Sequence, residues 1–354
     1  MSDIIDCPAE VKETLFRYLG WNSYRSERYK LLYVATPKVA CTSLKWWFAN
    51  LEGHSNDLRA IIDSAETDSD LVVHDSAHFH KIAPNVTGLT PEALIEPITS
   101  EAYFRFAVVR NPYQRTFSAW QSKLLLREPL QVAPYLDCSF YHHDIKNAGD
   151  IATAFEGFLE HLAANEAPNY WDVHWTPQAT LLRPDLIRYS KLVQIENAKE
   201  LSAALSKRIG PQFVDPLTRR STNESLIPYL PELITERSAE LIRSLYAKDF
   251  ESFGYGKQRP DAKETFSEEQ FKLALKAIEI IRGRHRRLGE MNAQIGILKQ
   301  TIANLNRTIT ERENERVARL HEIYTSYSWR LTKPLRFAAR LIREPESFFT
   351  RHHK

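Results

Sequence analysis

Hydrophobic residues in the first 256 positions fall into three short runs, and each run precedes a stretch of helical periodicity. The runs are LLYVA, FRFAVV and IRYSKLVQI, at residues 31–35, 104–109 and 187–195. The helical patterns that follow them cover residues 42–51, 113–127 and 197–209. Short apolar runs predict buried strands, and strands that alternate with helices predict a parallel sheet. The expected fold class is therefore α/β, with a parallel sheet flanked by helices.

Glycines and a weakly periodic segment divide the rest of this region. Gly53 and Gly210 follow two of the predicted helices, where glycine is a typical helix end. Residues 129–150 lack a clear period and predict a loop that covers the functional site. Residues 231–250 predict one further helix, closed by the sequence FGYG.

Beyond residue 256 the hydrophobic period changes to seven. Two sets of positions repeat every seven residues and together would form the apolar seam of a coiled coil. The first set is Ile281, Leu288, Ile295, Ile302 and Ile309, and the second set is Met291, Leu298 and Leu305. The first set is mostly isoleucine and the second is mostly leucine, which favours a parallel two-stranded coiled coil. We therefore expect a homo-oligomer that associates through residues 281–309. The alternative is a long helix that packs against its own domain, because Arg312 and Arg316 interrupt the seam.

The last residues are basic and amphipathic. In a helix opened by Pro334, one face would carry apolar residues and the other faces would carry arginines. The apolar positions are Leu335, Ala338, Ala339 and Ile342, and the basic ones are Arg336, Arg340 and Arg343. Residues 331–343 thus predict a peripheral contact with an anionic membrane, or else an ordinary surface helix. The expected domains are 1–256, a long helix at 257–325, and a tail at 326–354.

Charge is divided unevenly along the 354 residues, although the net charge is only +2. Residues 1–256 hold 26 Lys and Arg against 33 Asp and Glu, and residues 257–354 hold 21 against 12. The basic part lacks the interleaved aromatic residues of nucleic-acid platforms, so we expect no nucleic-acid partner. Three widely spaced cysteines and an N-terminus without a signal-peptide pattern predict a cytoplasmic protein, soluble or peripheral at the inner face of the membrane.

The sequence PKVACTSLK lies between the first predicted strand and its helix. The first amides of a helix are unpaired and favour anions. Lys38 adds a positive charge, and Thr42 and Ser43 add hydroxyl donors. The segment contains no glycine and is not a P-loop, so it suits one terminal phosphate or sulfate better than a wrapped triphosphate. The alternative is a solvated lysine beside two hydroxyls that cap the helix.

A second group of anion-binding residues follows the second strand, in VVRNPYQRTFSAW. Arg110 stands at the strand end, and Ser118 lies eight residues later on the following helix. An arginine fork and a serine hydroxyl can converge on one phosphate. Two strand-end anion sites in one sheet suit a ligand with two separated anionic groups, such as adenosine with a 3′-phosphate and a 5′-phosphosulfate.

These two motifs resemble the 5′-phosphosulfate loop and the 3′-phosphate motif of PAPS-dependent sulfotransferases, where PAPS is 3′-phosphoadenosine 5′-phosphosulfate. The most similar group is the carbohydrate sulfotransferases that include the HNK-1 and chondroitin 4-O sulfotransferases. Three later blocks, at 174–201, 218–224 and 241–255, resemble that group in the same order. The animal enzymes carry a cysteine pair where this chain has Leu182 and Asp185, and a membrane anchor that we do not find here, which suggests a cytosolic, bacterial member.

The resemblance implies the sulfotransferase fold, a P-loop-like sheet, and a donor site for PAPS, with PAP (adenosine 3′,5′-bisphosphate) as product. It assigns Lys38 to the leaving bridge oxygen as a catalytic residue. The residues that it implies at the 5′ end are Lys38, Val39, Ala40, Cys41, Thr42 and Ser43. Those that it implies at the 3′-phosphate are Arg110, Ser118 and Arg220. It suggests no metal.

The acceptor hydroxyl needs a base, and histidine is suited to that role near neutral pH. The segment VVHDSAHFHKI supplies His74, His78 and His80, and His74 is the favoured catalytic base. His174 is the second candidate, and Glu101 is a weaker one. Three histidines in one row could instead bind zinc, but no cysteine or clear carboxylate completes such a site.

The expected function is transfer of the sulfuryl group from PAPS to a hydroxyl of a carbohydrate acceptor, a surface polysaccharide or a glycolipid. One alternative is a nucleotide-dependent kinase, which would need a magnesium-binding aspartate after an apolar strand that we do not find. Another alternative is an inactive sulfotransferase-like domain that serves as a coiled-coil scaffold.

Overall fold

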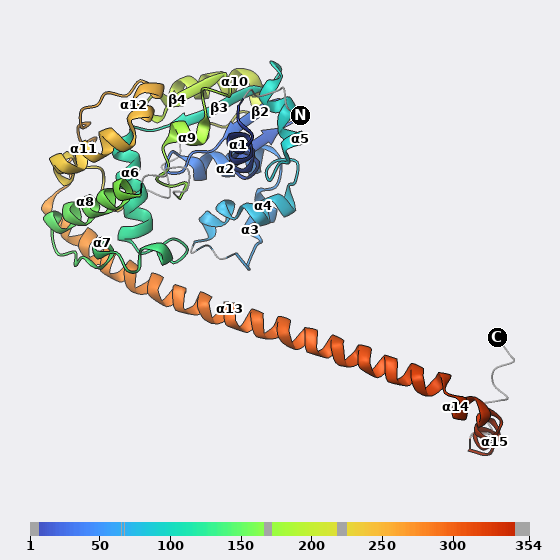
Figure 1. Ribbon diagram of the computed structural model, residues 1–354. Coiled ribbons are helices and arrows are strands. Elements are labelled where there is room, and N and C mark those ends of the chain that lie inside the picture. The colour runs from blue at the N-terminus through green and yellow to red at the C-terminus, as the bar shows by residue number, and fades with distance from the viewer. Residues whose placement is uncertain (1–6, 65, 67, 166–171, 218–224, 344–354) are drawn as a thin grey trace. The chain divides into compact units, whose positions relative to one another are not determined.

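The computed structural model describes residues 7–64, 66, 68–165, 172–217 and 225–343 (Figure 1). The chain divides into two compact units, residues 1–289 and 290–354. Each unit is described by itself below. The block at 218–224 that resembles the family, with Arg220, lies outside the described residues.

A four-stranded sheet forms the centre of the first unit, in the order β1-β2-β3-β4. Its strands are β1 Ser23–Ser26, β2 Leu31–Val34, β3 Phe104–Val109 and β4 Lys191–Gln194. β2, β3 and β4 are parallel, which confirms the predicted parallel core, whereas β1 is antiparallel to β2. β1 has the sequence SYRS and was not predicted, because it has no apolar run. β4 is shorter than the predicted 187–195, since Arg105 Nε binds the Arg188 carbonyl before the strand begins.

Helices enclose the sheet. Their bounds are α1 Ala9–Asn22, α2 Cys41–Leu51, α3 Ser55–Arg59, α4 Ser76–Ile82, α5 Pro91–Thr99, α6 Pro112–Trp120, α7 Ser139–His142, α8 Ala148–Ala164, α9 Gln178–Leu182, α10 Ala198–Ile209, α11 Glu236–Leu245 and α12 Ala247–Phe253. Two short segments matter for the site: the 3₁₀ helix η1, Ser69–His74, and the π-helical turn η2, Gln121–Leu125, which continues α6.

Most predicted helices are confirmed. α2, α10, and α6 with η2 match the patterns at 42–51, 197–209 and 113–127. The single helix predicted at 231–250 is wrong, because the chain breaks at Tyr246 between α11 and α12, and the Tyr246 hydroxyl donates to the Trp175 carbonyl at 2.8 Å. The predicted loop at 129–150 contains the short α7 and the first turn of α8. The rest of α8 lies in a segment for which the sequence pattern predicts no helix or strand.

Both faces of the sheet are covered, as expected for a parallel sheet. One face, including Tyr33 and Phe106, packs on α2, α4 and α10. The opposite face, including Val34 and Val109, packs on α1, α5 and α9. A third core joins α6, α8 and α11, which lie side by side in Figure 1. These layers bury both faces of β2 and β3 and leave their carboxyl ends to face the site.

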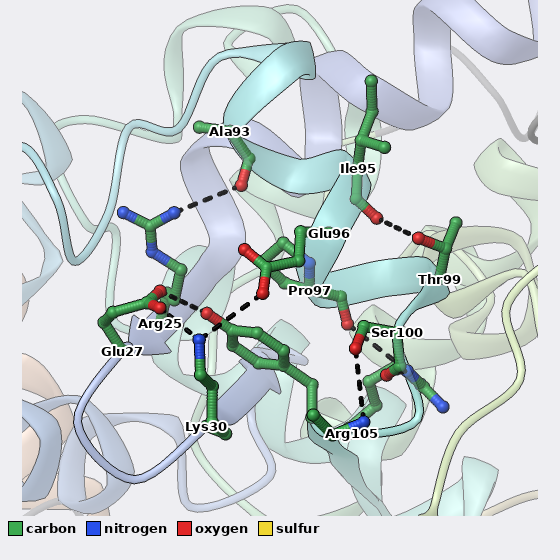
Figure 2. A network of polar contacts seen from close by, with 12 residues as sticks. Arg25, Glu27, Lys30, Ala93, Ile95, Glu96, Pro97, Thr99, Ser100 and Arg105 are labelled. Atoms are coloured by element: carbon green, nitrogen blue, oxygen red, sulfur yellow. Dashed lines mark hydrogen bonds and ion pairs between the residues drawn. The ribbon is translucent and has the colours of Figure 1, made fainter.

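A polar network fastens the opposite edge of the sheet, where the parallel strands begin (Figure 2). Arg105 Nη1 donates to the Ser100 carbonyl at 2.6 Å, while its Nε holds the Arg188 carbonyl at 2.7 Å. Lys30, between β1 and β2, pairs with Glu96 of α5 at 3.4 Å. This edge therefore has a structural role.

The long helix α13, Glu268–Thr325, runs from the first unit into the second. Arg282 Nε donates to the Leu125 carbonyl at 2.6 Å, and Ala274 and Ile278 are buried in the third core. The second unit continues with α14 Tyr327–Leu331 and α15 Lys333–Arg343. Among the described residues, no helix has the length and apolar character needed to span a bilayer.

Candidate active site

A cleft of about 1060 Å³ opens at the carboxyl ends of β2 and β3. Ligands of open α/β sheets bind at this edge. The cleft brings together most of the residues singled out in the sequence: Lys38, Ala40, Cys41, Thr42, Ser43, His74, Arg110, Ser118 and His174. Val39 is buried in the core instead, so only its main chain can serve the 5′ loop.

The loop after β2 achieves a tight turn without glycine. Lys38 has φ +67° and Ala40 has φ +50°, both in the left-handed region. Each non-glycine residue in this conformation costs about 1–2 kcal/mol. Ala40 is the N-cap of α2 and provides no side-chain cap, so Thr42 and Ser43 are not capping residues. The N-terminus of α2, where helix amides favour an anion, lines the cleft.

Lys38 is a cation that lacks an ion-pair partner among the described residues, although the charge of Glu128 acts on it. Burial, together with the charges of Lys123 and Arg110, lowers the pKa of Lys38 to about 8. Its ammonium group makes no hydrogen bond or ion pair with any residue in the described part of the chain. A half-buried cation beside the N-terminus of a helix is an arrangement that an anionic ligand would stabilise.

Arg110 is fixed by its main chain, and its guanidinium projects to the cleft. The Arg110 amide donates to Gln178 Oε1 at 2.9 Å, and its carbonyl accepts from Gln178 Nε2 at 2.9 Å. Arg110 Nη1 makes a long contact of 3.4 Å with the Lys38 carbonyl, which links the two strand ends. Ser118 Oγ, on α6, lies 3.2 Å from Ser225 Oγ.

Asp249 of α12 supports this arrangement from behind. It is fully buried and accepts hydrogen bonds from the Gln178 and Ala179 amides at 2.9 and 2.7 Å. Its carboxylate thus accepts hydrogen bonds from the first amides of α9 and positions Gln178, which is hydrogen-bonded to the main chain of Arg110. Sequence reasoning missed both Asp249 and Gln178. The sequence of α12, AKDFESF, does not distinguish Asp249 from the neighbouring charged residues Lys248 and Glu251.

Arg115 joins three separate segments and was also missed as a site residue. It is fully buried, and its three donors reach the carbonyls of Pro37, Thr176 and Val173 at 3.1, 2.9 and 3.1 Å. Such charge-assisted bonds are strong. They lock the loop after β2 to the segment that carries His174.

His74, at the end of η1, lies between two polar groups. Its Nε2 is 2.8 Å from Thr42 Oγ1, and its Nδ1 is 3.2 Å from Lys45 Nζ. Burial, followed by the charges of Lys45 and Lys123, keeps the pKa of His74 well below its ordinary value. The imidazole is therefore neutral at physiological pH.

His174 forms a dyad with Asp172. Its Nδ1 lies 2.5 Å from Asp172 Oδ1, and its amide donates to the same oxygen at 2.9 Å. The imidazole side chain is 20% exposed. Burial lowers the pKa of His174 to about 4, although Asp172 opposes this effect.

The other candidate bases lie outside the cleft. His78 is held between Asp75 and Asp63 at 2.8 and 3.0 Å, and His80 Nδ1 contacts the Thr87 carbonyl. Glu101 pairs with Arg188 at the amino-terminal edge of the sheet. Within the described ranges, no group of three or more His, Cys, Asp or Glu side chains could hold a metal ion.

Comparison with known proteins gives a consistent set of similarities. The Sulfotransferase family matches residues 21–256. Carbohydrate sulfotransferase 10 of Danio rerio is 24% identical over an alignment of 253 residues, with 65% of each chain covered. The Homo sapiens protein of the same name is 26% identical over an alignment of 261 residues, with 66% of each chain covered. Carbohydrate sulfotransferase 14 of Mus musculus is 31% identical over 189 residues, 52% of this chain and 44% of that protein.

The chain spans just under two thirds of the length of the first two relatives. No solved structure matches it. The family match covers more than half of the chain and includes the sheet, the loop after β2 and the segment after β3. The chain therefore belongs to the Sulfotransferase family.

Proposed function

We propose that this protein transfers the sulfuryl group from PAPS to a hydroxyl of a carbohydrate acceptor. The observation that carries the proposal is the pair of cations, Lys38 and Arg110, at the carboxyl ends of two adjacent parallel strands. Both line one cleft, and Lys38 makes no ion pair with any residue that the structure describes. A donor with separated 5′ and 3′ anionic groups complements this pair.

The donor-binding roles follow from position. Lys38 would donate to the bridge oxygen that leaves sulfur, and the α2 amides with Thr42 and Ser43 would hold the 5′-phosphate. Arg110 and Ser118 would hold the 3′-phosphate, with Arg220 as the further cation implied by resemblance. Catalysis of this kind depends on position and electrostatic stabilisation. His74 stays the sequence-based prediction for the base.

A carbohydrate acceptor is supported by the names of the relatives, which are carbohydrate sulfotransferases. We propose a surface polysaccharide or glycolipid, and a cytoplasmic location. The kinase and inactive-scaffold alternatives find no support in the family match.

Calorimetric titration with PAP tests the donor site without knowledge of the acceptor. We expect Lys38→Ala and Arg110→Ala each to weaken binding by at least tenfold, since each removes a charge-assisted contact of about 1.5–3 kcal/mol. Arg188→Ala is a matched control, because this side chain is 88% exposed at the opposite edge of the sheet. Absence of PAP binding by the wild-type protein, or equal binding by all variants, would contradict the proposal. Tight binding of ATP with Mg²⁺ in place of PAP would favour the kinase.

We also propose that two copies associate through α13. Ile281 and Leu288 of the predicted seam line the cleft of the first unit. The remaining seam positions, Met291, Ile295, Leu298, Ile302, Leu305 and Ile309, are 44–61% exposed. Their seven-residue period fits a second copy of the same helix.

Sedimentation equilibrium tests the association. Ile302→Asp places a charge in the seam and should shift a dimer to monomer. Ile297→Asp is the control, because Ile297 is 67% exposed but lies two positions after a seam residue. A wild-type monomer at micromolar concentration would refute the proposal.

A peripheral membrane contact through residues 331–343 is proposed on similar grounds. Leu335 and Ile342 of α15 are 71% and 81% exposed, on a helix with several arginines. Co-sedimentation with vesicles rich in phosphatidylserine should exceed that with phosphatidylcholine vesicles, and Leu335→Asp should reduce it. Equal recovery with both vesicles would count against the contact.

A further inference from the structure

The hydrogen bonds of His74 fix its tautomer. The Lys45 ammonium group can only donate hydrogen bonds. It also makes a cation–π contact with Tyr24, at 5.5 Å from the ring centre. His74 Nδ1 must therefore accept from Lys45, and Nε2 carries the proton that is donated to Thr42 Oγ1. Both nitrogens are engaged, and neither offers a lone pair to a substrate.

The hydrogen bonds of His174 fix the opposite tautomer. Hydrogen bonding to His174 lowers the pKa of Asp172 in spite of burial, so Asp172 is an ionised acceptor. His174 Nδ1 must therefore carry the proton, and the lone pair lies on Nε2. Nε2 has no hydrogen-bond partner among the residues that the structure describes. His174 lines the same cleft as Lys38.

The position of His174 is coupled to the donor loop. Arg115 holds the carbonyls of Val173 and Thr176, one residue before and two residues after His174. The same guanidinium holds the Pro37 carbonyl, next to Lys38. Since one fully buried side chain fixes both segments, the distance from Lys38 to His174 is set by the fold.

We infer that His174, oriented by Asp172, is the catalytic base, and that His74 is a positioning residue for Thr42 and Lys45. In the step, an acceptor hydroxyl oxygen forms a bond to sulfur while the bond from sulfur to the bridge oxygen breaks. The bridge oxygen leaves on PAP, stabilised by Lys38, and the hydroxyl proton moves to His174 Nε2. Asp172 then stabilises the imidazolium, as a carboxylate does in an acid–base–nucleophile triad. This inference rests on the proposed function.

The first test needs neither donor nor acceptor. Histidine ¹⁵N spectra of the full chain distinguish the two neutral tautomers, and His74→Gln and His174→Gln assign the signals. We expect the Nδ1–H tautomer at His174 and the Nε2–H tautomer at His74. Asp172→Asn should switch His174 to the Nε2–H tautomer, because the asparagine amide group can donate to Nδ1. The Nε2–H tautomer at His174 in the wild-type chain would overturn the inference.

The second test measures PAP release from PAPS with water as acceptor, beside calorimetry with PAP. We expect His174→Ala to lower the release rate by about 10²-fold or more with unchanged PAP affinity. Asp172→Asn should lower the rate similarly, whereas His74→Ala should mainly weaken PAP binding. Two results would refute the role of the His174–Asp172 dyad without contradicting the donor site. The first is a wild-type chain that binds PAP but releases no PAP from PAPS. The second is a full release rate in His174→Ala together with a lost release rate in His74→Ala. Failure to bind PAP would instead refute the proposed function.

Discussion

The lowered pKa of Lys38 makes donor binding sensitive to alkaline pH. Burial and the nearby Lys123 disfavour the ammonium form in the unliganded protein, and the pKa falls to about 8. An anion at the 5′ end would favour that form and raise the pKa again. Binding of PAP must then take up a proton above pH 8.

The magnitude follows from the pKa. At pH 9 about one Lys38 side chain in eleven is charged, so PAP affinity should fall about tenfold per pH unit above 8, or about 1.4 kcal/mol. The phosphates of PAP titrate near pH 6 and add no change in this range. The free energy of unfolding of the unliganded protein should instead increase as pH rises above 8. This follows because the folded state, in which the pKa of Lys38 is lowered, disfavours the charged ammonium form.

Calorimetry at pH 7, 8, 9 and 9.5 in buffers of different ionisation enthalpy measures both affinity and proton uptake. Lys38→Arg is the matched variant, since guanidinium stays charged throughout this range. Its PAP affinity should not show the tenfold loss per pH unit. Cys41→Ser removes the nearby thiol as a source of the effect.

Constant wild-type affinity from pH 7 to 9.5, with no proton uptake, would refute the reasoning. It would mean that the Lys38 ammonium does not contact the bound anion. A loss of affinity that persists in Lys38→Arg would assign the titration to another group.

Three further predictions concern the framework, and urea unfolding measures each. Arg115→Lys cannot keep all three carbonyl contacts and should cost about 2–4 kcal/mol; equal stability would contradict the clamp. Gly88→Ala places a Cβ 2.3 Å from His80 Nδ1 at φ +68°, and should cost more than Gly53→Ala, where φ is +83° and nothing lies within 4 Å. Asp249→Asn should lower the free energy of unfolding by about 1–3 kcal/mol and weaken PAP binding, because an amide group replaces one of the oxygens that accept from α9. Unchanged PAP binding would contradict the link from Asp249 to the donor site.

Much of the fold was predictable because its strong signals are local. The runs at 31–35 and 104–109 are apolar apart from Arg105, so burial on both faces is expected from their composition. β1 could not be found in this way, because its polar sequence is stabilised by pairing with β2. The break at Tyr246 was equally hidden, since it depends on a hydrogen bond to a residue 71 positions away.

The amino-acid sequence by itself predicted the proposed anion site of this protein. Lys38, Thr42 and Arg110 follow apolar strands, and parallel strands end at one edge, so their convergence follows from the order of the elements. Tertiary structure alone decided which histidine can act as a base. His74 meets Thr42, 32 residues earlier, and Lys45, and both of its nitrogens are occupied. His174 Nδ1 donates to Asp172, and its Nε2 has no hydrogen-bond partner among the residues that the structure describes. The position of the proton depends on the neighbours that the fold provides and not on residue type.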